Sequence, residues 1–85
     1  MSLEDLRKKV DKTDAKIIRL IAERIRISEE IGKEKKRQGR QIGDTERERK
    51  VLENVRKMAR DEKISPEDIE SIYRQIIIAS KRVQE

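Results

Sequence analysis

The sequence predicts an all-α protein of three helices, one long and two shorter. Apolar residues recur every three or four positions along most of the chain, which is the period of a helix face. No stretch shows the two-residue alternation of a half-buried strand. Gly39 and Pro66 stand where helices commonly end and begin.

The first helix is expected to run from about Leu3 to about Gln38. It contains no proline, and its single Gly32 costs only about 1 kcal/mol relative to alanine. At about 1.5 Å per residue the helix would be roughly 50 Å long, more than two short helices can cover. Its broad apolar arc therefore predicts an intertwined homodimer, in which each long helix packs partly on its copy.

A glycine-containing break follows, and a second helix then runs to about Glu62. Either Asp44 or Thr45 can be its N-cap, and Thr45 with Glu48 has the spacing of a capping box. Ser65 is the expected cap of the third helix. The apolar positions of the two helices are Val51, Leu52, Val55, Met58 and Ala59, then Ile69, Ile72, Tyr73, Ile76, Ile77 and Val83.

The amino-acid composition limits the classes of function that the chain can have. Residues 1–85 suffice for a single small domain, nearly half of them are charged, and the net charge is +5. Without cysteine or histidine the chain lacks thiolates, the usual proton carrier at neutral pH and the commonest metal ligand. No apolar run approaches the ~20 residues of a membrane span and no secretory signal is visible, so a cytoplasmic protein without membrane association is expected.

Two cations fall on the apolar face of the first helix. This face includes Leu6, and Arg24 follows it by eighteen positions, a whole number of helical turns. Lys35 lies on the same face near the end of the helix. Burying an unpaired charge costs several kcal/mol, so each cation must reach either solvent or a compensating anion.

The shorter helices repeat this pattern, with Arg47 and Glu48 beside the apolar face of the second and Ser80 and Gln84 on that of the third. Taken singly, these side chains have ordinary explanations, such as a solvated stem, a cap, an offset to the helix dipole or a fraying end. Taken together they favour a binding site, because the inward cations outnumber the inward carboxylates. The surplus predicts a small multivalent anion held between the helices.

Five short features occur in a fixed order: Leu6-Arg7-Lys8-Lys9-Val10-Asp11, Leu20-Ile21-Ala22-Glu23-Arg24, Ile31-Gly32-Lys33-Glu34-Lys35, Asp44-Thr45-Glu46-Arg47-Glu48-Arg49, and the late Ser80 with Gln84. Through them the chain resembles the all-helical chorismate mutase family without a gap. The resemblance implies a dimer of three-helix protomers with two active sites. It also implies an isomerase of the shikimate pathway, converting chorismate to prephenate in phenylalanine and tyrosine biosynthesis without a metal or cofactor.

The resemblance assigns catalytic roles to three residues. Lys35 and Gln84 match the pair that hydrogen-bonds the ether oxygen of the breaking carbon–oxygen bond, and Glu48 matches the acceptor for the ring hydroxyl. Some relatives carry Glu at the position of Gln84. A neutral amide donates a hydrogen bond without first taking up a proton, so no acidic pH dependence is expected.

Five further residues match substrate-binding positions of the family. Arg24, Arg47 and Ser80 would bind the carboxylates of chorismate or prephenate. Arg7 would do the same from the other protomer of the homodimer. The backbone at Asp44 would assist Glu48 at the ring hydroxyl.

Two alternatives remain open. Isochorismate-pyruvate lyases share the fold and bind a similar dianion, but they generally lack a carboxylate at the position of Glu48. A non-enzymatic basic helical module would suit the net charge, yet Tyr73 is the one aromatic residue and acids are interspersed among the basic residues. We therefore expect no nucleic-acid partner, and a free-standing mutase, since the length leaves no room for a second domain.

Overall fold

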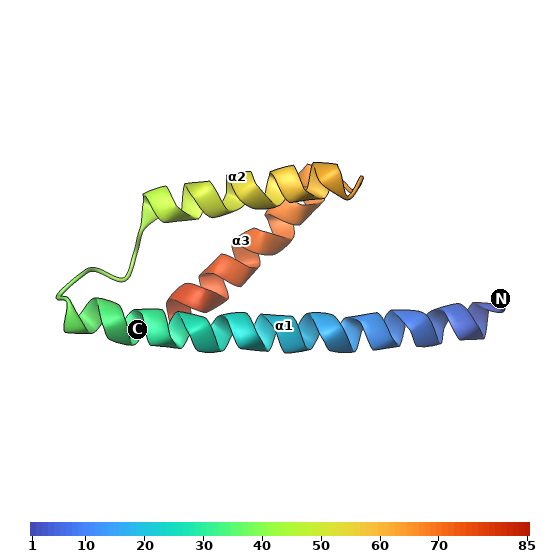
Figure 1. The fold of residues 1–85 in the computed structure, drawn as a ribbon, viewed down its shortest axis with the longest axis horizontal. Coiled ribbons are helices and arrows are strands. Elements are labelled where there is room, and N and C mark those ends of the chain that lie inside the picture. Colours follow the sequence, from blue (N-terminus) through green and yellow to red (C-terminus); the bar gives the residue numbers. More distant parts are fainter.

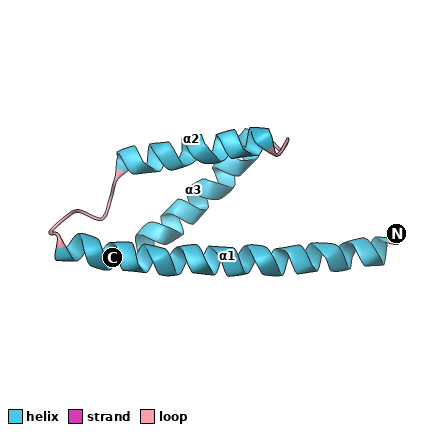
Figure 2. Cartoon of the chain, viewed as in Figure 1, coloured by secondary structure: helices cyan, strands magenta, loops and turns pink.

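The computed structural model describes all 85 residues and is entirely helical outside its turns and ends. Helix α1 spans Leu3–Arg37, α2 spans Thr45–Asp61 and α3 spans Pro66–Arg82. The last two form a hairpin, and α3 crosses from α2 to α1, packing against both, whereas α2 makes no close backbone approach to α1 (Figure 1). Two short connections join the helices (Figure 2). The predicted all-α class with one long and two shorter helices is confirmed.

Helix α1 ends in a Schellman motif, which satisfies its last carbonyl groups. Gly39 adopts a left-handed conformation with φ 68°. Its amide donates to the carbonyl of Lys36 at 3.1 Å, and the amide of Arg40 donates to that of Lys35 at 2.8 Å. Gly39 therefore stops the helix where the sequence predicted, and it turns the chain toward α2.

Side-chain caps begin the other helices. Asp44 is the N-cap of α2, and its carboxylate accepts a hydrogen bond from the amide of Arg47 at 3.0 Å. Thr45 is already the first helical residue, so the capping-box spacing seen in the sequence has no role. Ser65 caps α3 as predicted, accepting from the amide of Asp68 at 3.2 Å.

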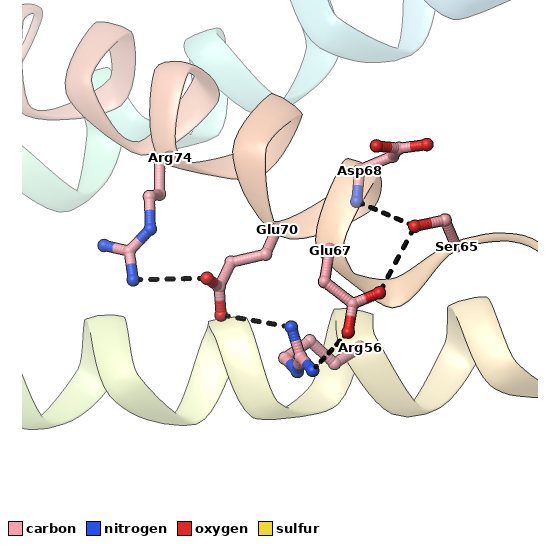
Figure 3. A network of polar contacts seen from close by, with 6 residues as sticks. All are labelled: Arg56, Ser65, Glu67, Asp68, Glu70 and Arg74. Atoms are coloured by element: carbon pink, nitrogen blue, oxygen red, sulfur yellow. Dashed lines mark hydrogen bonds and ion pairs between the residues drawn. The ribbon is translucent and has the colours of Figure 1, made fainter.

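A network of ion pairs joins the two helices of the hairpin (Figure 3). Arg56 of α2 lies 3.4 Å from Glu67 and 3.6 Å from Glu70, and Glu70 also pairs with Arg74 at 3.4 Å. A hydrogen bond from its own backbone amide, helped by Arg56, holds the pKa of Glu67 below its usual value. Such partly exposed pairs contribute little free energy to the stability of the hairpin.

Very little apolar surface is buried within one chain. Val55 and Ala59, in the α2–α3 hairpin, are the buried apolar residues. The helical spacing of Val51, Val55 and Met58 predicts that all three are buried, but Met58 is 60% exposed. The radius of gyration is 15.9 Å, whereas a compact domain of this length has about 12 Å. No helix combines the length and apolar character needed to cross a bilayer.

The N-terminal half of α1 extends away from the rest of the molecule (Figure 1). Every residue from Met1 to Leu20 is exposed. This half carries an uncovered apolar row that we name the α1 apolar row, comprising Leu3, Leu6, Val10, Ile17, Ile18 and Leu20. Six large apolar side chains on one solvated helix are unusual for a stable monomer.

Candidate active site

A pocket of about 290 Å³ lies between the C-terminal half of α1, the beginning of α2 and the end of α3. It is lined by seven of the eight residues that the sequence singled out, and these come from all three helices and their flanking segments. The seven are Arg24, Lys35, Asp44, Arg47, Glu48, Ser80 and Gln84. The fold therefore brings polar residues that are far apart in the sequence together in one pocket.

Arg7 is the predicted site residue that does not line the pocket. It is exposed near the free end of α1. Seventeen residues separate it from Arg24 on the same helix, a distance of about 25 Å along the axis. Within one chain Arg7 cannot reach the pocket, so its expected contribution from a second protomer stays a prediction.

Arg24 is held in a defined orientation by α3. Its Nη1 donates to Oγ of Ser80 at 2.5 Å, and its guanidinium lies 5.9 Å from the centroid of the Tyr73 ring. Ser80 is 6% exposed, so the contact lies in the interior of the helix crossing. One donor is used by Ser80, which leaves the other N–H groups of the fork able to bind a carboxylate.

Lys35 and Gln84 form the second polar group of the pocket. Nζ of Lys35 donates to the carbonyl of Ile42 at 2.7 Å and to Oε1 of Gln84 at 3.4 Å. An ammonium group has three donors, so one remains for a ligand. Because the amide oxygen of Gln84 faces Lys35, its NH₂ group is also left as a donor. Two hydrogen-bond donors thus stand side by side.

Glu48 provides a carboxylate acceptor in the same pocket. Nζ of Lys81 lies 3.0 Å from Oε1 of Glu48, joining the end of α3 to the first turn of α2. Both side chains are partly exposed, so this pair adds little to stability. It occupies one carboxylate oxygen of Glu48 and leaves the other for a ligand.

The charges lining the pocket match a small dianion. Arg24, Lys35, Arg47 and Lys81 supply four positive charges, against Asp44 and Glu48, which leaves a formal charge of +2. Between the charged groups the wall is apolar, made by Ile27, Ile31, Ile42, Val51 and Ile77. A site of this composition suits a small dicarboxylate with an apolar body.

Residues 6–85 match the model of the family described as chorismate mutase type II. The chain belongs to the chorismate mutase type II family. The membership confirms the resemblance that the sequence motifs indicated, and it gives the pocket the context of an isomerase.

Two proteins with chorismate mutase in their names are similar to this chain in sequence. The chain is 32% identical over 82 residues to the chorismate mutase of Methanocaldococcus jannaschii, covering 96% of this chain and 83% of the relative. It is 34% identical over 80 residues to a bifunctional chorismate mutase/prephenate dehydratase of Aquifex aeolicus. That match covers 91% of this chain and 22% of the longer protein.

A solved structure has the same fold. A conserved hypothetical protein from Pyrococcus furiosus superposes with a TM-score of 0.77 at 36% sequence identity. The match covers 98% of this chain and 95% of the other. The long helix with its attached hairpin is therefore the arrangement of a known protein.

Three contributors to the pocket were not predicted from the sequence. Ser28 lines the pocket one turn after Arg24 and donates to the Arg24 carbonyl at 3.0 Å. Its signal was present, because Ser28 and Gly32 put two small residues on one face, as close helix packing requires. Lys81 had no signal among 23 basic residues. The Ile42 carbonyl is a backbone group, which no side-chain pattern reveals.

Proposed function

We propose that this chorismate mutase acts in the pocket between its three helices, where it rearranges chorismate to prephenate on the route to phenylalanine and tyrosine. The observation that carries the assignment is the convergence of seven family-matched residues on one pocket with a formal charge of +2. Chorismate carries two carboxylates, so the charges are complementary. The reaction is pericyclic and needs no nucleophile or proton shuttle, which suits a chain without histidine or cysteine.

The first task of the site is to gather a flexible substrate into its reactive, chair-like shape. Arg24, fixed by Ser80 and by the Tyr73 ring, provides a preorganised grip for one carboxylate. Arg47, in the first turn of α2, provides a second cation across the pocket. Holding both ends of the substrate in this way removes much of the entropic part of the barrier.

The second task is to stabilise charge that develops during the reaction. As the carbon–oxygen bond lengthens, negative charge grows on the ether oxygen. The free donors of Lys35 and Gln84 would meet that oxygen together, and their hydrogen bonds strengthen as the charge grows. These interactions are stronger in the transition state than with bound substrate, so they raise kcat.

Glu48 completes the arrangement by accepting a hydrogen bond from the ring hydroxyl. One of its oxygens faces Lys81, which leaves the other to accept from the ligand. The backbone of Asp44, the N-cap residue of α2, lies at the same end of the pocket. This acceptor distinguishes the site from those of lyases of the same fold.

The working unit is an intertwined homodimer. The α1 apolar row is exposed on an extended chain, and a second copy of the same helix is the simplest surface that buries it. In such a dimer Arg7 of the partner subunit would approach the pocket and bind a carboxylate. Each site would then contain residues from both protomers.

A product assay tests the assignment. Purified protein is incubated with chorismate and with isochorismate, and the products are separated and identified. Prephenate from chorismate is the expected result. Formation of salicylate and pyruvate from isochorismate, without prephenate, would make the chain a lyase. A salt-sensitive gel shift with nucleic acid and no turnover would instead support a basic binding module.

Replacing Gln84 by glutamate is expected to make turnover dependent on acid. The amide of Gln84 donates at any ordinary pH, whereas a glutamic acid donates only when protonated, well below neutral pH. The wild-type kcat should stay nearly flat from about pH 5 to 8, while that of Gln84→Glu falls about tenfold for each pH unit above its titration. A flat profile in the variant at wild-type activity would contradict the donor role.

A further inference from the structure

The side-chain amide of Gln84, the proposed donor to the ether oxygen, belongs to a segment that is not part of any helix. Helix α3 ends at Arg82, and Val83 is its C-cap. Gln84 therefore belongs to a three-residue C-terminal tail, Val83–Glu85. The i→i−4 hydrogen bonding of α3 ends at Val83, whose amide donates to the carbonyl of Ala79 at 3.3 Å, so the position of Gln84 depends on other contacts of the tail. Even so, Gln84 is only 9% exposed.

The tail packs on α1 at Gly32. Of the three glycines of the chain, Gly32 is the one at which an added Cβ would meet other atoms within 4 Å. A Cβ atom at position 32 would lie 2.8 Å from Cα of Gln84 and 3.0 Å from its Cβ. Real Cβ atoms essentially never show a contact as short as 2.8 Å, and 3.0 Å is tighter than most of their contacts. The obstructing atoms are the backbone and stem of Gln84, so a side chain at position 32 would have to push the tail away.

Besides the Val83–Ala79 bond, one hydrogen bond joins the tail to α3 and two join it to α1. The amide of Gln84 donates to the carbonyl of Lys81 at 3.1 Å. Nζ of Lys36, one turn after Gly32, donates to the carbonyl of Glu85 at 3.2 Å. Nζ of Lys35, also on α1, donates to Oε1 of Gln84 at 3.4 Å. The Lys36 bond is exposed and the Lys35 bond is long, so the packing of Gln84 against Gly32 is the closest contact of the tail with α1.

We propose that Gly32 is a positioning residue for catalysis, which seats the C-terminal tail so that the Gln84 amide reaches the ether oxygen. The inference rests on the proposed mutase mechanism. Gly32 touches no substrate, and its effect passes through Gln84. A methyl group at this position moves the amide by a fraction of an ångström or more, and misplacement of that order costs up to about a hundredfold in rate.

The expected consequence is that activity and stability change in different directions. Alanine is the better residue inside a helix, so Gly32→Ala favours α1. The displaced residues lie beyond the last turn of α3, so the hydrogen bonds within the helices are kept. Gly32→Ala should therefore keep or raise the thermal midpoint while kcat falls about tenfold to a hundredfold and KM changes by less than about threefold.

The experiment compares Gly32→Ala, Gln84→Ala and the double variant with wild type. If Gly32 acts through Gln84, adding Gly32→Ala to Gln84→Ala lowers kcat by less than about twofold, because no amide remains to misplace. Exchange of the Gln84 backbone amide, read by NMR, should be faster in Gly32→Ala. The matched control is Gly43→Ala, since nothing lies within 4 Å of a Cβ at that position.

The outcomes distinguish a failure of the proposed function from a failure of the positioning role of Gly32. A wild-type protein without chorismate turnover overturns the proposed function. Normal turnover in both wild type and Gly32→Ala overturns the positioning role alone. A full additional loss in the double variant, or an unchanged exchange rate at Gln84, would also overturn it, because Gly32 would then act by another route.

Discussion

Replacing Lys35 by alanine is expected to lower kcat at least about a hundredfold while the protein stays folded. Nζ of Lys35 has two of its donors on Ile42 and Gln84, so the third is available for the ether oxygen in the proposed mechanism. Removing one preorganised donor from such a site costs about 100- to 1000-fold. Because the interaction is made mainly in the transition state, KM should change much less. Steady-state ultraviolet assays of chorismate loss measure both.

The control for this variant must keep the helix and remove a cation elsewhere. Lys33→Ala serves, because Lys33 lies on the same helix, is exposed and does not line the pocket. It should keep wild-type turnover. Lys35→Ala also releases the Ile42 carbonyl, so circular dichroism and size exclusion must show an intact fold. Turnover within about tenfold of wild type would remove Lys35 from the mechanism.

Mixing two inactive variants is expected to restore activity. Arg7→Ala and Arg24→Ala, purified separately, should each lose most turnover, because each removes one cation from every site. In a mixed dimer one site receives both substitutions and the other receives neither. Random exchange of equal amounts makes half of the dimers mixed, so activity should return to about a quarter of the wild-type value.

A second mixture shows whether the recovery requires a shared site. Arg24 and Lys35 line the pocket from the same chain, so every site in a mixed dimer of Arg24→Ala and Lys35→Ala keeps one defect. That mixture should stay inactive under identical conditions. Exchange itself is followed with differently tagged subunits. Absence of recovery in the first mixture, with exchange demonstrated, would exclude a contribution of Arg7 from the partner subunit.

The helices were predictable because their signals are local. Gly39 and Ser65 act on the backbone within a few residues, and both work in the structure as their sequence contexts indicate. The choice between Asp44 and Thr45 was not local, because either side chain can cap. In the structure Asp44 is the N-cap of α2. It lies where the chain leaves the turn after Ile42 and enters the helix.

The candidate site was predictable in its residues and not in its contacts. Helical periodicity placed Arg24 and Lys35 on one apolar face, and the family motifs matched their partners on the other helices. The pairing of Lys81 with Glu48 escaped prediction, since it depends on how α3 crosses the start of α2. Arg7 lies outside the pocket of one chain, and its expected contribution from a second protomer stays a prediction.

The sequence by itself determined the three helices, the surplus of inward positive charge and the family to which the chain belongs. The helices and the surplus charge follow from spacing and residue type, which act over one or two helical turns. The family follows from comparing residues position by position. Only the tertiary structure decided that Gly32 lies beneath Gln84, with a closest approach of 2.8 Å for an added Cβ. In the sequence Gly32 was a small cost to a long helix. In the structure it is the place where the end of the chain packs on α1, because helix crossing brings together residues that no periodic pattern relates.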